Sequence, residues 1–228
     1  PSVLFVAGGA ASMDDGATRE RIEPLLSIAL RSFAGKKVIS GGTVAGVPGC
    51  VGAVKSVLQS ALPGRGSLDF KLVGYIPKHL PQDARRDDRY DRLIVCGNDH
   101  FGPEQILKSW NDLLDAGTHP DEVLVLGLGG GPLTALEYRL ALALGTRIGI
   151  VSGTGGAVAT LEHDPLWSSD PNLIPLPFDG ASVRAYVAPP ASGFEQDVLE
   201  DMSRAFHEQY LASSSGRLPD NMKPWERL

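Results

Sequence analysis

Short runs of apolar, often β-branched residues alternate along the chain with longer segments in which apolar residues recur every three or four positions. The short runs predict strands at residues 3–6, 38–39, 71–76, 93–96, 123–126, 147–151 and 183–187. The longer segments predict helices at about 17–33, 51–62, 103–117, 133–144 and 194–211. Because strands that alternate with helices build βαβ units, the pattern predicts an α/β protein with a mostly parallel sheet.

Glycine-rich turns follow several of the predicted strands. In a parallel sheet such turns meet at the carboxyl ends of the strands, where ligands bind. Glycine has no Cβ atom, so its backbone amides can approach phosphate oxygens closely, and a helix that starts after the turn adds unpaired amides. The turns therefore predict a phosphate site, with the candidate ligand-binding residues Gly8, Gly9, Ser12, Gly41, Gly42, Gly97, Asn98, Gly130, Gly131, Gly153 and Thr154. The alternative interpretation is that these glycines only satisfy the steric requirements of tight turns and bind no ligand.

Charge and composition narrow the possible partners. The formal net charge of -6 disfavours broad nucleic-acid binding, which depends on clustered Lys and Arg. Two cysteines are too few for a disulfide-stapled secreted domain, and no stretch reaches the roughly 18 apolar residues of a membrane span. The N-terminus also lacks the pattern of a signal peptide. We therefore expect a cytoplasmic protein that is neither inserted in a membrane nor exported.

Several chemistries lack their sequence motifs. No Gly-Lys-Ser/Thr of a P-loop, no clean G-x-G-x-x-G and no Gly-x-Ser-x-Gly occurs, which argues against an ATPase, an NAD-dependent dehydrogenase and a serine hydrolase. The five histidines have no metal-ligand spacing, and the two cysteines form no C-x-x-C pair. We expect no metal site and no required cofactor apart from the nucleotide ligand discussed below.

A charged segment at residues 77–92 contains no apolar helical stripe and starts on the ligand side of the predicted sheet. One hypothesis is that it forms a lid over the ligand, with Arg85 or Arg86 pairing with a phosphate. Arg89 serves as the internal control, because Asp88 and Asp91 offer it local partners. The alternative is a solvated surface whose alternating charges neutralise one another.

Three motifs follow one another along the chain: SGGTVAGVPGCVG at 40–52, LIVCGNDHFGPE at 93–104 and GGGPLT at 129–134. In this order they resemble the N-terminal cytosolic domain of melastatin-type TRP channels, and above all its prokaryotic, LSDAT-like relatives. That domain belongs to the SLOG superfamily, with DNA-processing protein A and the cytokinin-activating LOG proteins. The resemblance spans about residues 3–187 and implies a Rossmann-like, doubly wound sheet with helices on both faces. By position it adds to the candidate site Thr43, Gly46, Pro132 and Thr134.

The resemblance also implies a function. Domains of this kind bind ADP-ribose in some channels, and prokaryotic relatives are suspected nucleotide sensors fused to effectors. We therefore expect a signalling domain that binds a nucleotide or nucleotide-derived ligand, ADP-ribose-like and linear or cyclic. The expected partners are this small molecule, a fused or separate effector, and further copies of the chain in a homo-oligomer.

An enzymatic alternative comes from the LOG proteins. Gly130, Gly131 and the run from Thr134 to Glu137 resemble part of a Pro-Gly-Gly-x-Gly-Thr-x-x-Glu signature, in which the Glu assists cleavage of an N-glycosidic bond. Leu133 replaces the last glycine of that signature, and no Arg-Lys-x-x-Met segment matches. Glu137 is thus a ligand-site candidate, and a catalytic residue only if the chain is a nucleoside-monophosphate phosphoribohydrolase. A third reading is an interaction module that binds no nucleotide.

The chain divides into two parts. Residues 1–212 are predicted to form the SLOG-like nucleotide-binding domain, and 213–228 a linker. The residues MKPWE at 222–226 resemble the opening of a ryanodine-receptor-type repeat.

Overall fold

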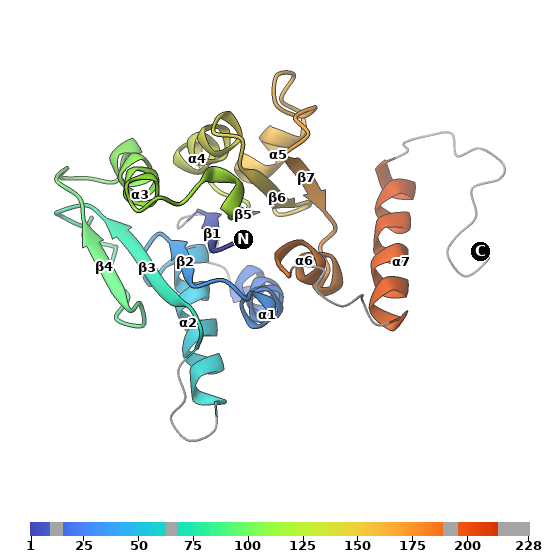
Figure 1. Cartoon of the computed structure of the whole chain (residues 1–228), viewed down its shortest axis with the longest axis horizontal. Helices are drawn as coiled ribbons and strands as arrows, with labels where there is room; N and C mark the ends of the chain where they lie inside the picture. The colour runs from blue at the N-terminus through green and yellow to red at the C-terminus, as the bar shows by residue number, and fades with distance from the viewer. Residues whose placement is uncertain (10–15, 63–67, 189–195, 214–228) are drawn as a thin grey trace.

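A seven-stranded, entirely parallel sheet organises the molecule, with the strand order β4-β3-β2-β1-β5-β6-β7 (Figure 1). The structure is a computed structural model that describes residues 1–9, 16–62, 68–188 and 196–213. The strands are β1 (Val3–Gly8), β2 (Lys37–Ser40), β3 (Lys71–Ile76), β4 (Arg92–Val95), β5 (Val123–Leu128), β6 (Arg147–Val151) and β7 (Leu173–Leu176). All but the last of these were expected from the apolar runs.

The strand order reverses between β1 and β5. From β1 the chain builds the sheet outward through β2 and β3 to β4, and then returns to place β5 beside β1. The two central strands are in register from Val3 opposite Val123 to Gly8 opposite Leu128. In doubly wound sheets such a reversal separates the loops beyond the carboxyl ends of the two strands and leaves a crevice for ligands.

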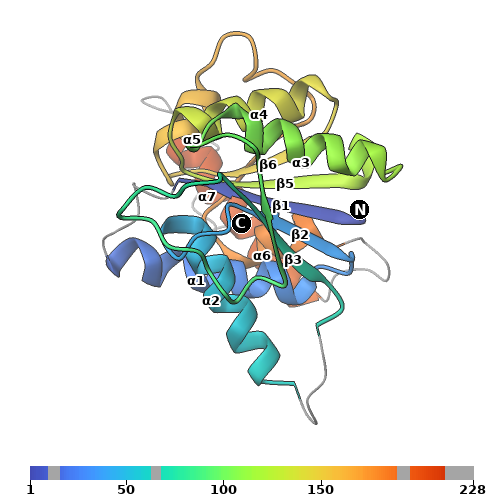
Figure 2. The ribbon, with the colours of Figure 1, turned by 90° about the vertical axis from the view of Figure 1, so that its left-hand side faces the viewer.

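Helices cover both faces of the sheet (Figure 2). One face carries α3 (Pro103–Asp115), α4 (Pro132–Ala143) and α5 (Gly156–Glu162), and the other α1 (Gly16–Ser32), α2 (Gly46–Ser60) and α6 (Gly180–Val187). A last described helix, α7 (Gln196–Ser213), packs against α6, and a short 3-10 turn, Pro120–Glu122, precedes β5. The predicted Rossmann-like, doubly wound α/β fold is confirmed. Among the described helices, none combines the length and the apolar character needed to cross a membrane.

Each face of the sheet has its own apolar core. Leu4 and Leu126 point into the core under α1, α2 and α6, whereas Phe5 and Val125 point into the core under α3, α4 and α5. This follows from the pleat of a strand, which sends successive side chains to opposite faces. Cys50 and Cys96 are buried free thiols in the two opposite cores.

The prediction of a strand at 183–187 is wrong, since this segment lies in α6. The Asp179 side chain caps the helix by accepting a hydrogen bond from the Ser182 amide at 2.9 Å. Val183 and Val187, one helical turn apart, are both fully buried in the core. The four-residue spacing and the cap outweigh the strand preference of the β-branched residues.

Strand β7 was not expected, because its segment is rich in proline. Pro175 lies within the strand opposite Ile150 of β6. Proline removes one ladder donor, which an edge strand tolerates, and β7 pairs with β6 alone.

Helix α2 begins five residues earlier than the apolar pattern predicted, at Gly46. Glycines of the 40–52 motif therefore lie inside the helix, where they allow close packing. A Cβ atom on Gly49 would stand 1.9 Å from the Val44 carbonyl oxygen, and one on Gly52 would stand 2.2 Å from Asp87 Oδ2. These glycines serve contacts between α2 and its neighbours rather than a turn.

Candidate functional site

A cavity of about 420 Å³ lies beyond the carboxyl ends of the central strands. Its lining comes from the end of β1 with Gly8 and Gly9, the end of β2 with Ser40, Gly41 and Thr43, the first turns of α3, and the Gly130–Gly131 turn with the first turns of α4. This is the position of the crevice at the reversal of strand order. Its volume is within the range of about 300–1,000 Å³ typical of small-molecule sites.

The N-terminus of α4 provides one end of the cavity. Gly129 and Gly130 have φ values of +60° and +101°, which glycine adopts without strain. The next residue, Gly131, caps the helix, and the Ala135 amide donates the first helical bond to its carbonyl at 2.9 Å. Pro132 has no N–H group, but the amides of Leu133 and Thr134 have no acceptor within the helix, and the helix dipole adds positive potential there. This end of the cavity suits an anionic oxygen.

Another part of the lining is an apolar wall. It contains the side chains of Phe5, Ile39, Tyr75, Phe101 and Ile106. The Phe5 ring is stacked at 5.2 Å on Trp110 of α3, which holds it in place. Burial and the neighbouring Asp112 raise the pKa of Tyr75, so its hydroxyl stays protonated and donates to Asp112 Oδ2 at 3.1 Å. Such a wall suits a flat, weakly polar group such as a base.

Phe101 reaches the cavity through the loop at residues 97–102. Gln105 Nε2 donates to Asn98 Oδ1 at 2.7 Å, and the Gly102 amide donates to Gln105 Oε1 at 2.9 Å. The Asn98 carbonyl also accepts from the Lys78 amide at 2.9 Å. Asn98 and Gly97 lie outside the lining, so Asn98 shapes the loop that carries Phe101. Sequence reasoning missed Phe101 and Gln105; the helix start at Pro103, with a glutamine at its third position, was the available signal.

Glu137 is the ionisable carboxyl group in the lining. It is half-buried, and no described residue forms a hydrogen bond or ion pair with it. Burial raises the pKa of Glu137 to about 7. Among the described residues that line the cavity, none is Lys or Arg. An anionic group bound there would therefore depend on backbone amides and hydroxyl groups for its partners.

Replacing Glu137 should change how stability depends on pH. The folded protein holds a proton on Glu137 up to a pH of about 7, whereas the ordinary value is 4.5. Between these values the folded state binds more protons than the unfolded chain, so the free energy of unfolding falls as the pH rises. Glu137→Gln is expected to remove this decline and to stabilise the protein above pH 7. Urea unfolding of both proteins below and above this window measures the effect; parallel pH profiles would contradict it.

The turn after β6 braces the α4 turn from outside the cavity. Thr154 Oγ1 accepts a hydrogen bond from the Gly129 amide at 2.9 Å and donates to the Val151 carbonyl at 2.6 Å. The Gly130 carbonyl accepts from the Ala157 amide at 2.8 Å. Gly153 and Thr154 were predicted to contact ligand, but neither lines the cavity. In this structure Thr154 supports the turn that does.

Two glycines of the β2 turn are likewise placed outside the lining. Gly42 has a φ of +82°, and a Cβ atom there would lie 3.0 Å from side-chain atoms of both Ile76 and Leu93. Gly46 is the first residue of α2. Both glycines meet backbone and packing requirements of the fold.

Substitution of Gly42 is therefore expected to destabilise the protein rather than to block ligand binding selectively. Gly42→Ala adds a Cβ atom to a left-handed residue that is packed against β3 and β4. We expect a loss of about 1–2 kcal/mol in the free energy of unfolding, from backbone strain and overpacking. Urea denaturation tests this, with Gly97→Ala as the control, because a Cβ atom at Gly97 meets no atom within 4 Å. Equal midpoints for both variants would contradict the assignment.

The predicted ligand residues thus fall into three groups. Those that line the cavity are Gly8, Gly9, Gly41, Thr43, Gly130, Gly131, Pro132, Thr134 and Glu137. Those outside the lining are Gly42, Gly46, Gly97, Asn98, Gly153 and Thr154. Ser12 lies outside the described residues.

The charged segment at 77–92 has no helix, as predicted, but it contributes to the core, which was not predicted. Asp87 is 1% exposed and Tyr90 7% exposed. The Asp87 carboxylate accepts from Arg89 Nε and Nη2, both at 2.7 Å, and the Asp87 amide donates to the Gly42 carbonyl at 3.1 Å. The expected pairing of Arg89 with Asp88 and Asp91 is therefore wrong, since its partner is Asp87.

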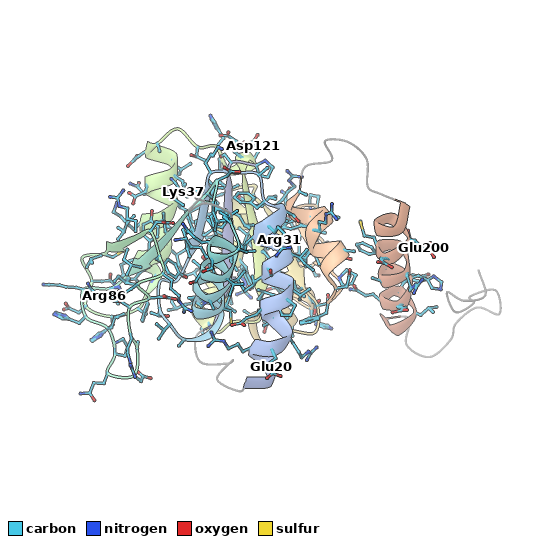
Figure 3. All side chains as sticks on the ribbon, turned by 90° about the horizontal axis from the view of Figure 1, so that it is seen from below. Glu20, Arg31, Lys37, Arg86, Asp121 and Glu200 are labelled. Atoms are coloured by element: carbon cyan, nitrogen blue, oxygen red, sulfur yellow. The ribbon has the colours of Figure 1, made fainter. Side chains whose placement is uncertain are left out.

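The two lid candidates lie on the surface. Arg85 and Arg86 are exposed, and neither lines the cavity. The Arg85 carbonyl accepts from the Val44 amide at 3.1 Å, and Arg86 forms an antiparallel bridge with Thr43. Figure 3 shows Arg86 at the edge of the molecule opposite α7. The backbone of this segment is attached to the turn after β2. None of its described arginines lines the cavity.

Comparisons with known proteins agree with this architecture. Two structures of the molybdenum cofactor carrier protein from Chlamydomonas reinhardtii share the fold. One is 18% identical, covers 81% of this chain and 94% of its own, and superposes with a TM-score of 0.54. The other is 19% identical, with coverages of 87% and 98% and a TM-score of 0.51. A search of curated protein sequences finds no significant match.

The family comparison is more specific. The family described as "SLOG in TRPM, prokaryote" matches residues 1–173, which include every strand up to the start of β7 and all parts of the cavity. The match confirms the similarity suggested by the three ordered motifs. This chain belongs to the prokaryotic family of SLOG domains related to those of TRPM channels.

Proposed function

We propose that this SLOG domain binds a nucleotide or nucleotide-derived signal, ADP-ribose-like and linear or cyclic, in the cavity at the β1–β5 reversal. Its occupancy is passed to a fused or separate effector. One observation carries the proposal: a helix N-terminus with the unpaired amides of Leu133 and Thr134 and an aromatic, apolar wall share a single cavity of about 420 Å³. A nucleotide has the two matching parts, an anionic phosphate and a flat base.

Hydroxyl groups in the same lining suit a ribose. Thr43 is 4% exposed and Ser40 7% exposed, and both belong to the lining. Ser40 Oγ donates its proton to the Val6 carbonyl at 2.8 Å, so toward a ligand this oxygen can act only as an acceptor. Sugar hydroxyls could therefore donate to the lining while phosphate oxygens accept from backbone amides. This division of donors and acceptors favours a nucleotide over a purely apolar ligand or a bare anion.

Calorimetric titration of AMP, ADP-ribose and cyclic ADP-ribose into the protein tests the proposal. Binding of at least one of them should also raise the melting temperature, because a ligand specific for the folded state stabilises it by mass action. Ribose and inorganic phosphate, each carrying only one part of the ligand, are the controls and should bind much more weakly. If no nucleotide binds to the folded protein, the interaction-module reading replaces this proposal.

A second function, nucleoside-monophosphate phosphoribohydrolase activity, is favoured by one observation. Glu137 lines the cavity, no Lys or Arg is among the described residues of that lining, and burial raises the pKa of Glu137 to about 7. A carboxyl group that titrates near neutral pH can act as a general acid or base. The test is release of adenine from AMP, measured by chromatography, and its loss in Glu137→Gln. Tight nucleotide binding without release of base would leave the sensor function alone.

A further inference from the structure

We propose that ligand occupancy of the cavity is coupled to the docking of α7 through the turn at residues 152–156, which joins β6 to α5. The inference rests on the proposed function for the identity of the ligand, but the mechanical link is independent of it. Hydrogen bonds connect this turn to the cavity on one side and to α7 on the other. The turn itself is outside the cavity lining.

The link to the cavity consists of direct backbone contacts. The Gly129 amide donates to Thr154 Oγ1, and the Ala157 amide donates to the Gly130 carbonyl, as described above. The two backbones are so close that a Cβ atom on Gly156 would lie 2.2 Å from the Gly130 oxygen. A ligand that accepts from the amides of Leu133 and Thr134 therefore cannot shift the Gly129–Gly131 turn without shifting the turn after β6.

The link to α7 is made by Ser152. Its hydroxyl donates to Glu162 Oε1 at 2.6 Å, and its amide donates to the Leu176 carbonyl at 2.9 Å. A serine hydroxyl has one proton, so once this is given to Glu162 the oxygen can only accept. It accepts from Gln209 Nε2 of α7 at 3.2 Å. The contact thus requires Ser152 and Glu162 to keep their present arrangement.

Helix α7 is suited to respond because its attachment is limited. It stands outside the two helix layers and packs against α6 (Figure 1, Figure 3). Phe206 and Tyr210 on α7 remain 43% and 54% exposed. An element with little buried apolar contact belongs to the part of a protein that opens most readily. One hydrogen bond can therefore change its docked population measurably.

The coupling has a predictable size and is reciprocal. A neutral hydrogen bond contributes enough to change an equilibrium by about twofold to tenfold. If the ligand strengthens the Ser152–Gln209 contact by that factor, docking of α7 must tighten ligand binding by the same factor. The expected loss of affinity in Gln209→Ala is thus about twofold to tenfold, although Gln209 lies outside the cavity lining.

Amide hydrogen exchange on the whole chain tests the proposal without any ligand. Gln209→Ala should speed exchange at Gly129 and Ala157, whose amides are bonded across the turn. Glu208→Ala is the matched control, because Glu208 is an exposed neighbour on the same helix. In the reverse direction, Thr154→Val should speed exchange in α7, and Thr154→Ser, which keeps the hydroxyl, should restore it. The coupling is overturned if exchange at Gly129 and Ala157 is unchanged in Gln209→Ala and exchange in α7 is unchanged in Thr154→Val.

Addition of ADP-ribose provides the second arm. Slower exchange in α7 of the parent protein, and a smaller effect in Gln209→Ala, are the expected results. Binding of ADP-ribose with no change in α7 overturns the coupling and leaves the proposed function intact. Absence of ADP-ribose binding counts against the proposed ligand only, and the ligand-free exchange then decides the coupling.

Discussion

Gly131→Val is expected to weaken nucleotide binding at least about tenfold and to leave the folded protein almost as stable as the parent. Gly131 lines the cavity, its φ of -104° is open to any residue, and a Cβ atom there meets no atom within 4 Å. The added side chain therefore costs the fold little and occupies space next to the α4 amides. Loss of even one hydrogen bond to a charged phosphate, at about 1.5–3 kcal/mol, reduces affinity about tenfold to hundredfold.

Gly97→Val is the matched control for this prediction. Its Cβ atom likewise meets no atom within 4 Å, but Gly97 is outside the lining. Titration of ADP-ribose into both variants, with folding checked by circular dichroism, separates the two positions. Parental affinity in well-folded Gly131→Val would remove the α4 turn from the site. A loss of affinity in Gly97→Val would instead show that the loop after β4 contacts the ligand, as the glycine pattern predicted.

Asp87→Ala is expected to cause the largest loss of stability, about 2–3 kcal/mol. Asp87 is 1% exposed and holds Arg89 through two hydrogen bonds of 2.7 Å. Removing one partner of a buried pair typically costs about 3–5 kcal/mol, because the other charge is left unpaired. The Arg89 side chain is 32% exposed, so water offsets part of that cost.

Asp88→Ala provides the control, since Asp88 is the exposed neighbour of Asp87. A surface substitution of this kind usually changes stability by less than about 0.5 kcal/mol. Urea unfolding of both variants gives the difference in midpoint. Equal midpoints would show that the 77–92 segment is a solvated surface, as its alternating charges first suggested, and that the ion pair contributes nothing.

The regular elements could be predicted because their signal is local. The strands β1, β3 and β6 and the helices α3 and α4 follow from apolar period and from proline or glycine at their ends. The glycine turn at 129–131 is also local, because a strand runs into it and a helix out of it. Parallel strands then bring such turns to one edge, which is why nine of the predicted ligand residues line one cavity.

Other features depended on contacts between distant segments. Nothing near Gly52 in the chain shows that Asp87 will press against it, so its role in helix packing could not be predicted. The pairing of Arg89 with Asp87 rather than with Asp88 or Asp91 also depends on burial, because all three carboxylates are close in sequence. Phe101 reaches the cavity on a loop that the Asn98–Gln105 and Lys78–Asn98 hydrogen bonds shape.

The sequence by itself determined the α/β class, the ordered motifs of the SLOG family and the edge of the sheet at which the candidate cavity lies. These follow from periodicity and from glycine, whose effects reach only a few residues along the chain. Tertiary structure alone decided which glycines face the cavity, that the charged segment is anchored, and that Thr154 braces the turn beside Gly131. Burial and the direction of a side chain depend on residues brought together from separate strands and helices, and no local pattern encodes them.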